Sequence, residues 1–357
     1  MRLCLTLQAI AWHMVLSSAL CGTAFAAASL NSTISHFTTT DGTTYAYDFN
    51  PASGSNATFL LLHGYPSSHK DWEHQITALN AAGFGTLAPD MLGFGASDMP
   101  TDPHQYRAKR LAGHLTELLD HNSLGTVIGV GHDWGSVILT RLAVYYPDRF
   151  EKFVFVNVGY QAPGGFVDLD ALNSMLSAEY GYMPYGYWYF FDRYDAGAVI
   201  KTHLESFWHL VFPENHTIWV DHLAPISAAR SWLQADTKTN DPSFLSAAYK
   251  SDWLAWMSRP NATESGLNCY RSQLRGINDA DESTLKTEDW ELRVPVLAIG
   301  GSLDPIGRAD LVVASTQLWA LAGFETKTLD SGHWTAQELP DEVSELLLEF
   351  ARKGLVH

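Results

Sequence analysis

The sequence predicts an α/β protein in which a mostly parallel β-sheet has helices on both faces and a long helical insertion interrupts the sheet pattern. Three observations lead to this prediction. Short apolar segments alternate with helical patterns up to residue 160, the alternation stops over residues 161–278, and it resumes from residue 279. Repetition of strand, helix and strand is typical of a parallel sheet that is covered on both faces.

The segments that we interpret as strands lie on both sides of this insertion. Two alternating segments flank a turn at Asp41 and Gly42 and predict a hairpin. The remaining strands are predicted from short apolar runs, and the main helices from apolar residues at helical spacing. The hairpin strands are 34–39 and 43–48, the other strands are 58–62, 84–88, 126–130, 153–158, 295–299 and 326–329, and the helices are 106–120, 136–146 and 341–353.

The insertion is predicted to be a helical cap that is rich in aromatic side chains. Six tyrosines lie between Tyr180 and Tyr194, and six tryptophans lie between Trp188 and Trp256. We therefore expect a core that is formed by residues 27–160 and 279–357, with the cap at 161–278. The aromatic residues of the cap favour an apolar, bulky substrate.

The N-terminal segment has the pattern of a secretory signal peptide. Arg2 precedes an apolar run, and residues 3–40 contain no Asp, Glu, Lys or Arg. Ala24 and Ala26 offer a small-residue cleavage site, so we expect a signal peptide at residues 1–26 and secretion of the mature protein. An uncleaved membrane anchor is the alternative, although Gln8 and His13 make the run rather polar. Four N-glycosylation sequons fit a secretory route: Asn31, Asn56, Asn215 and Asn261.

Composition excludes several classes of partner. The net charge of −17 argues against nucleic acid and anionic membrane surfaces. No second apolar run is long enough to span a bilayer, so no stable membrane insertion is expected. Two of three cysteines, Cys4 and Cys21, lie in the signal segment, which leaves Cys269 as a small hydrophobe without a disulfide partner. No metal-binding motif is present, and neither a metal nor a cofactor is expected.

A reactive aspartate is predicted at the turn between one strand and the following helix. Gly131 and Gly135 lie two places before and after Asp133, as a tight turn that presents a nucleophile requires. Aspartate at this position indicates attack on a saturated carbon, which leaves an alkyl ester on the protein. A capping or turn residue is the structural alternative for this aspartate.

Further polar residues follow the ends of other predicted strands. Asp304 comes after 295–299 and His333 comes after 326–329, and the order nucleophile, acid, histidine is that of a hydrolytic triad. His333 would activate water against the ester, and Asp304 would orient the imidazole. The backbone N–H groups of Tyr65 and Trp134 would stabilise the resulting oxyanion. His63 is interpreted as a loop-bracing residue.

At these residues the chain resembles the epoxide hydrolase branch of the α/β-hydrolases. The resemblance covers nearly all of the mature chain and rests on the motifs at residues 63–66, 90–98, 131–135 and 332–334. It implies an α/β-hydrolase fold, a small apolar epoxide and water as reactants, and two cap tyrosines that protonate the epoxide oxygen. Tyr270 is similar in context to the second of these, and Tyr187 matches the first, with Tyr185 or Tyr189 as alternatives.

Two other functions remain open at this point. A haloalkane dehalogenase would use the same triad, with the Trp134 indole as a halide donor, although such enzymes usually carry Asn or Glu at the position of Tyr65. A catalytically silent carrier with the same fold is the second alternative. The sequence predicts neither the particular epoxide nor the stereochemistry nor the oligomeric state.

Overall fold

The computed structural model describes residues 34–164 and 167–354. The predicted signal peptide and the sequon at Asn31 lie outside the described residues. The sequons at Asn56, Asn215 and Asn261 are exposed, and their glycosylation stays a prediction. No helix within 34–164 or 167–354 has both the length and the hydropathy needed to cross a bilayer.

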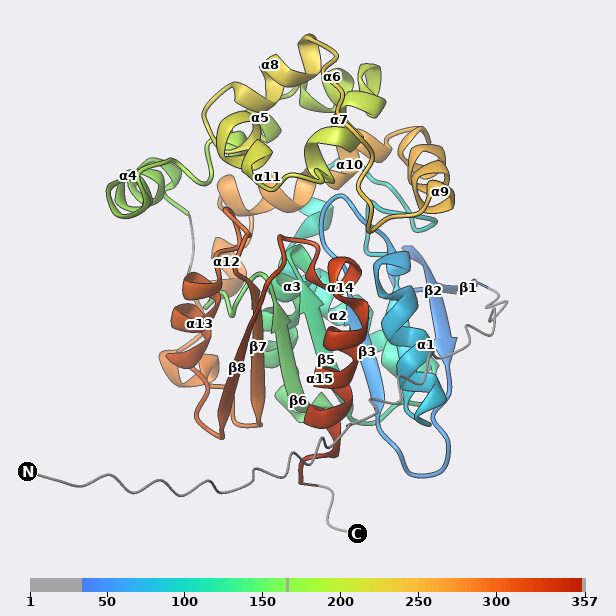
Figure 1. Ribbon diagram of the computed structural model, residues 1–357. Coiled ribbons are helices and arrows are strands. Elements are labelled where there is room, and N and C mark those ends of the chain that lie inside the picture. Colours follow the sequence, from blue (N-terminus) through green and yellow to red (C-terminus); the bar gives the residue numbers. More distant parts are fainter. Residues whose placement is uncertain (1–33, 165–166, 355–357) are drawn as a thin grey trace, which may run out of the picture. The chain divides into compact units, whose positions relative to one another are not determined.

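The core of the protein is an eight-stranded sheet (Figure 1). Its strands are β1 (Ser35–Thr38), β2 (Thr44–Asn50), β3 (Thr58–Leu62), β4 (Gly85–Pro89), β5 (Val127–His132), β6 (Phe150–Val156), β7 (Val296–Gly301) and β8 (Phe324–Leu329). They are arranged in the order β1-β2-β4-β3-β5-β6-β7-β8. The pairs β1–β2 and β2–β4 are antiparallel and all others are parallel, so the predicted hairpin and the mostly parallel sheet are confirmed.

Strand side chains alternate between two apolar layers. Phe59 and Leu61 point into the layer that is covered by helices α1 (Glu73–Ala81) and α15 (Pro340–Arg352). Leu60 and Leu62 point into the layer on the opposite face, which is covered by α2 (Ala108–His121) and α3 (Trp134–Tyr145). Burial of both faces accounts for the continuous apolar runs in the sequence. Helix α13 (Ala309–Gln317) and the short α14 (Thr335–Glu338) complete the core.

Strand ends bring the loops with polar residues to one edge of the sheet. In the register of the parallel strands, Leu62 pairs with Gly131, and His132 pairs with Val156. Gly301 likewise pairs with Leu329. The segments that follow these residues therefore start at the same level and face the same side, where ligands bind in open α/β sheets.

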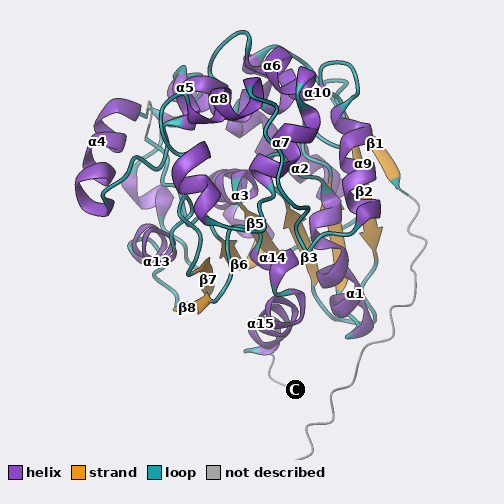
Figure 2. Ribbon diagram, turned by 45° about the horizontal axis from the view of Figure 1, so that its top comes forward, coloured by secondary structure: helices purple, strands orange, loops and turns teal. Residues whose placement is uncertain are grey.

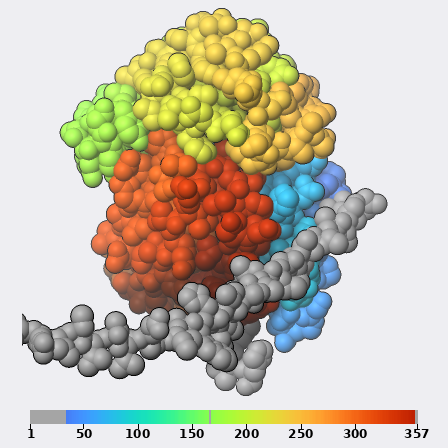
Figure 3. Space-filling view, in the orientation of Figure 1, coloured from blue at the N-terminus to red at the C-terminus, as the bar shows by residue number. Residues whose placement is uncertain are grey.

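The insertion between β6 and β7 is helical, as predicted, and covers this edge (Figures 1 and 2). Its helices are α4 (Leu169–Tyr180), α5 (Tyr187–Phe191), α6 (Ala196–Thr202), α7 (Leu204–Val211), α8 (Ala228–Gln234), α9 (Ala247–Met257), α10 (Ala262–Gly266), α11 (Asn268–Leu274) and α12 (Asp279–Glu282), with a π-helical turn at Trp219–Leu223. Short 3₁₀ turns lie at His69–Trp72, Pro103–Tyr106, Pro147–Arg149 and Thr287–Trp290. Figure 3 shows the cap surface, coloured from green to gold, above the red C-terminal part.

Apolar packing and a buried ion pair join the cap to the core. The apolar layer that contains Leu60 and Leu62 continues into the cap, where it includes Phe207 and Trp253. Near the end of the insertion, Arg141 Nε of α3 lies 2.8 Å from Glu282 Oε1, and both side chains are buried. Loss of one partner of such a pair costs about 3–5 kcal/mol of stability, because a charge is left buried without its counterion.

Candidate active site

Asp133 occupies the turn between β5 and α3 with an unusual backbone conformation. Its φ is +51° and its ψ is −122°, a region that residues with a side chain seldom adopt. The turn fits only because Gly131 and Gly135, two positions before and after Asp133, lack a Cβ atom. A Cβ on Gly131 would lie 2.7 Å from Gly135 O, and one on Gly135 would lie 2.1 Å from Leu62 O. The local geometry is therefore that of a strained corner that presents the Asp133 side chain.

The two carboxylate oxygens of Asp133 have different surroundings. Oδ1 accepts a hydrogen bond of 2.8 Å from the backbone N–H of Tyr65, and the backbone N–H of Trp134 also bonds to this carboxylate. Oδ2 faces the His333 imidazole, whose Nε2 lies 3.8 Å away. A Cβ on Gly64 would lie 2.3 Å from Oδ1, so this glycine lets the carboxylate approach the loop after β3. Oδ1 is thus held by the Tyr65 N–H group, while Oδ2 is the oxygen nearer to His333.

His333 and Asp304 are directly hydrogen-bonded. His333 Nδ1 donates to Asp304 Oδ2 over 2.7 Å, which leaves Nε2 directed at Asp133. The second oxygen of Asp304, Oδ1, accepts hydrogen bonds of 2.9 Å from the backbone N–H groups of Ile306 and Gly307. Both side chains are buried. The three residues that the sequence pattern selected from separate strand ends therefore come together in one cluster.

Burial and neighbouring charges set the protonation of this cluster. Burial raises the pKa of Asp133 and outweighs the nearby His333 and the two backbone N–H donors. Burial alone would lower the pKa of His333, but the carboxylates of Asp304 and Asp133 outweigh this effect and raise it. Burial opposes ionisation of Asp304 as well, yet His333 and the N–H groups of the following loop lower its pKa. Of the two carboxyl groups, Asp304 therefore ionises more readily than Asp133.

Further side chains enclose the imidazole of His333. His132 Nε2 donates to His333 O over 2.8 Å, and burial lowers the pKa of His132 to about 3, so this ring stays neutral. The Trp219 ring from the cap lies 5.0 Å from the His333 ring, and the Trp334 ring lies 5.2 Å from it. Solvent therefore has little access to the imidazole.

His63 lies outside this cluster and braces two loops. Its Nδ1 bonds to Gly64 O over 2.8 Å, and its Nε2 accepts from Met91 N over 2.9 Å. Burial lowers the pKa of His63 to about 4. Both ring nitrogens are occupied by the backbone, in keeping with the structural role inferred from the sequence.

Tyr187 and Tyr270 lie together beside Asp133. Their ring centroids are 5.9 Å apart, and the Tyr270 ring lies 4.8 Å from the Trp134 ring. Burial raises the pKa of both phenols, and the negative charge of Asp133 raises each of them further. Both hydroxyls are therefore protonated at neutral pH and close enough to Asp133 to sense its charge.

The alternative tyrosines have their hydroxyl groups bound elsewhere. Tyr185 donates to Ile306 O over 3.3 Å, and Tyr189 is bound to the Asp170 carboxylate at the surface. Tyr189 does not line the cavity that contains Asp133, whereas Tyr185 and Tyr187 do. The geometry thus favours Tyr187 over both alternatives as the partner of Tyr270.

A cavity of about 270 Å³ lies next to Asp133. Its walls are mainly apolar and come from α3, α4, α5 and α13. Met175 of α4 is 58 % exposed, and Ala314 of α13 is also exposed, so the cavity opens to solvent between these two helices. No group of residues suited to a metal ion occurs in the part of the chain that the structure describes.

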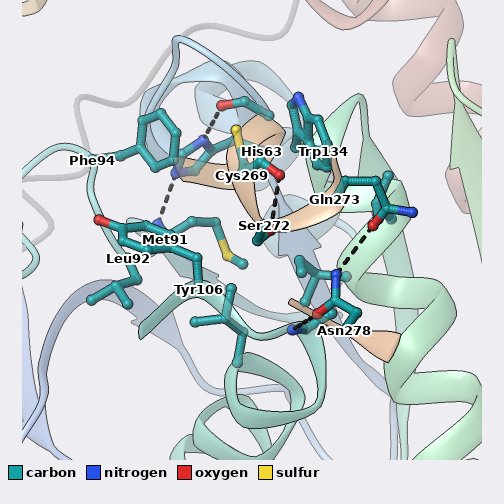
Figure 4. A pocket seen from close by; sticks show the side chains of 15 residues that line it. His63, Met91, Leu92, Phe94, Tyr106, Trp134, Cys269, Ser272, Gln273 and Asn278 are labelled. Atoms are coloured by element: carbon teal, nitrogen blue, oxygen red, sulfur yellow. Dashed lines mark hydrogen bonds between the residues drawn. The ribbon is translucent and has the colours of Figure 1, made fainter. Parts of the chain in front are cut away.

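Trp134 also borders a smaller cavity of about 30 Å³ (Figure 4). Trp134 and Gln273 border both cavities and form part of the wall between them. Cys269 also borders the smaller cavity, and its thiol donates to Gly266 O over 3.0 Å. The free thiol is half-buried.

Comparison with known proteins identifies the fold family. The family described as "alpha/beta hydrolase fold" matches residues 57–338, which is most of the chain. The protein belongs to the α/β-hydrolase fold family.

Within the α/β-hydrolases, the similar proteins are epoxide hydrolases. Epoxide hydrolase srdG of Neurospora crassa is 27 % identical over 336 residues, which are 90 % of this chain and 96 % of that protein. Epoxide hydrolase A of Mycobacterium tuberculosis is 28 % identical and matches 82 % of this chain and 89 % of its own length. The crystal structure of epoxide hydrolase A from Mycobacterium thermoresistibile matches with a TM-score of 0.71 at 24 % identity, covering 90 % of this chain and 99 % of that one.

An epoxide hydrolase from an endophytic Streptomyces has a TM-score of 0.73 at 25 % identity, and the match covers 89 % of this chain and 95 % of that one. These comparisons confirm the resemblance to the epoxide hydrolase branch of the family and the predicted α/β-hydrolase fold with a helical cap.

The structure of this α/β-hydrolase also reveals polar residues that the sequence analysis did not assign. Asn157 stands at the end of β6, where the sequence offers no carboxylate, and its Nδ2 donates to Asp304 Oδ2 over 3.1 Å. His132 is part of the nucleophile motif but had no predicted role. The sequence could have indicated a role for His132 through its position directly before Asp133, because the last residue of β5 must lie near the loops that follow the strands.

Proposed function

We propose that this protein hydrolyses an apolar epoxide to a vicinal diol through an ester formed on Asp133. One observation carries the proposal. Oδ2 of the half-buried Asp133 faces a histidine, while two protonated phenols lie close to the same carboxylate. The similarity to epoxide hydrolases supports the same reaction.

In the first step, Asp133 Oδ2 attacks one carbon of the epoxide ring. The C–O bond of the ring breaks, and the ring oxygen takes a proton from Tyr187 or Tyr270. Formation of the ester consumes the negative charge that contributes to the raised pKa of both phenols. Proton donation therefore becomes easier as the new bond forms, and general acid help of this kind contributes roughly 10²- to 10⁴-fold.

In the second step, water attacks the carbonyl carbon of the ester. His333 Nε2 takes the proton from this water, and Asp304 stabilises the imidazolium through the bond at Nδ1. Asp133 Oδ1 becomes the oxyanion, and the N–H groups of Tyr65 and Trp134 already bond to this carboxylate. One such donor is worth about 3–4 kcal/mol in the transition state. The bond between the Asp133 carboxyl carbon and the alkyl oxygen then breaks, and this oxygen takes the second proton of the water as the diol leaves. Asp133 is again a carboxylate, and the proton on His333 returns to the tyrosine by way of solvent.

A panel of small aryl and alkyl epoxides and bromoalkanes tests the proposal. We expect diol formation from the epoxides, little halide from the bromoalkanes, and loss of diol formation in Asp133→Asn. Halide release without diol formation would instead assign the protein as a dehalogenase. Absence of both activities would favour a carrier with this fold.

A further inference from the structure

The loop that contains His333 is bound on both sides by one carboxylate. Glu338, the last residue of α14, accepts a hydrogen bond of 2.7 Å at Oε2 from Gly332 N. Its other oxygen, Oε1, accepts one of 3.2 Å from Trp334 N. The Glu338 side chain is only 11 % exposed. The residues immediately before and after the histidine are therefore tied to the same side chain.

A histidine of the cap reaches the same carboxylate. His216 lies in the segment between α7 and the π-helical turn, and its Nε2 is 3.5 Å from Glu338 Oε2. It also packs directly on the loop, since a Cβ on Gly332 would lie 2.2 Å from His216 Nδ1. The cap thus contacts the His333 loop at the point where Glu338 holds it.

The stretch around His333 has other hydrogen bonds, since Gly332 O accepts from Asn157 Nδ2 and Thr335 Oγ1 over 3.1 Å each, but the backbone N–H groups of Gly332 and Trp334 bond to Glu338. The bond to Asp304 fixes one nitrogen of the ring, and the bond from His132 fixes the carbonyl oxygen. Neither sets how far the ring reaches toward Asp133, which depends on the path of the chain through Gly332 and Trp334. A shift of about 1 Å at such a position can cost roughly a hundredfold in rate.

We propose that Glu338 is a positioning residue for His333, and that His216 of the cap keeps the Glu338 carboxylate in place. The proposal rests on the function proposed above for its kinetic effect, but not for its effect on the histidine itself. The charged and titratable groups around His333 are Asp304, Asp133, Glu338, the neutral His132, and His216 of the cap, which borders the same small cavity as His333. Glu338 is one of the three carboxylates that raise the pKa of His333.

Glu338→Gln is the decisive variant because it keeps the size of the side chain and removes its charge. Glutamine can accept only one of the two backbone hydrogen bonds. We expect hydrolysis of the ester to slow roughly tenfold or more, with ester formation changed less than about twofold. The pKa of His333 should fall, because the imidazolium loses a nearby negative charge. The acid limb of the hydrolysis rate should then move to lower pH, which a purely structural brace would not cause.

Two further variants and a matched control complete the design. Glu338→Asp retains the charge but shortens the reach, so it should slow hydrolysis with a smaller movement of the acid limb. His216→Ala should have an effect in the same direction as Glu338→Gln but weaker, since both backbone bonds of Glu338 remain. Glu345→Gln changes an exposed carboxylate on α15 and should leave both rates and the acid limb unchanged.

The pKa of His333, measured by NMR titration of the imidazole in the wild type and in Glu338→Gln, gives a readout that needs no substrate. A lower pKa in the variant, together with slower ester hydrolysis, supports the proposal. An unchanged pKa overturns it, whether or not the rate changes. If the wild type fails to turn over epoxides but the pKa still falls, the proposed function fails while the role of Glu338 stands. Should Glu338→Gln not fold, Glu338→Asp and His216→Ala decide by the same titration.

Discussion

The core and the cap supply different parts of the candidate active site and hold them in different ways. In the core, Asp304 accepts hydrogen bonds from His333, Asn157 and two backbone N–H groups. In the cap, Tyr187 and Tyr270 are held mainly by contacts between aromatic rings. A buried charge requires such hydrogen bonds, whereas a neutral phenol can be buried among aromatic rings. The ionised groups therefore belong to the rigid strand ends, and the neutral donors belong to the cap.

This comparison assigns the two chemical steps to the two regions. Apart from Asp133 itself, on which the ester forms, substitutions in the core should affect hydrolysis of the ester, and substitutions in the cap should affect its formation. Substitutions at the mouth of the cavity should affect only which substrates enter.

The largest effect is expected for His333→Gln in the core. The variant lacks the base that activates water, so steady-state turnover should fall by about 10³-fold or more. Ester formation should continue, because a carboxylate needs no base to attack. Rapid-mixing measurements should show a burst of ring opening that equals the amount of enzyme, and the absence of this burst would break the division between core and cap.

A smaller effect is expected for Tyr187→Phe and Tyr270→Phe in the cap. Each variant should slow ester formation about ten- to a hundredfold, and the double variant should slow it further, because general acid help contributes roughly 10²- to 10⁴-fold. Tyr189→Phe is the matched control, since its hydroxyl is bound to Asp170 at the surface. Single-turnover rates of ring opening measure these effects, and unchanged rates in both variants would contradict the assignment of the two phenols.

The dependence on pH separates the free protein from the ester. In the proposed mechanism neutral His333 is the active form, so hydrolysis should slow as pH falls through its pKa, by about tenfold for each pH unit. In the free protein this pKa is raised above 6.5, partly by Asp133. The ester has lost the Asp133 charge, so the acid limb of hydrolysis should lie below the pKa that NMR titration gives for the free protein. If the midpoint of the acid limb equalled the pKa of His333 in the free protein, Asp133 would have kept its charge during hydrolysis, and no ester would have formed on it.

The smallest effect is expected at the mouth of the cavity. Ala314→Trp should narrow the opening between α4 and α13 and lower kcat/KM for a bulky epoxide severalfold, while a small epoxide is little affected. Gln317→Trp on the same helix is the control, because Gln317 is exposed and does not line the cavity. Equal losses for both substrates would mean that the substrate enters elsewhere.

The strands of the core were predictable because burial on both faces produces apolar runs that end in characteristic turns. The differences are instructive. Strand β6 begins at Phe150 rather than at residue 153. The prediction missed its first residues because Lys152 interrupts the apolar run. The buried ammonium group of Lys152 bonds to the backbone oxygens of Phe350, Ala351 and Lys353. The strand ends at Val156 because the next residue, Asn157, has a φ of +55°.

Helix α1 was not predicted, because a polar residue lies on its buried face. Gln75 is fully buried and donates to the backbone oxygens of Ala336 and Pro340, which interrupts the apolar periodicity. Helix α13 was not predicted either, since few of its apolar residues are buried.

Some residues of the candidate site could be predicted from short sequence motifs, and others only from contacts that the fold creates. Asp133, Asp304 and His333 each follow a strand and stand in short motifs, so local sequence was enough to propose them. Tyr187 could not be separated from Tyr185 and Tyr189 by spacing, because only the fold shows that the hydroxyls of the other two are bound to Ile306 O and Asp170. Asn157 contacts Asp304, which is distant in the sequence. Glu338 contacts Gly332 and Trp334 only because the chain turns between them and α14. Neither contact could be predicted from local sequence.

The most direct test is mass spectrometry of His333→Gln after reaction with an epoxide. We expect an added mass equal to that of the epoxide on the peptide that contains Asp133, and no added mass in the double variant with Asp133→Asn. An adduct on another side chain, or no adduct while diol still forms, would contradict the proposed mechanism.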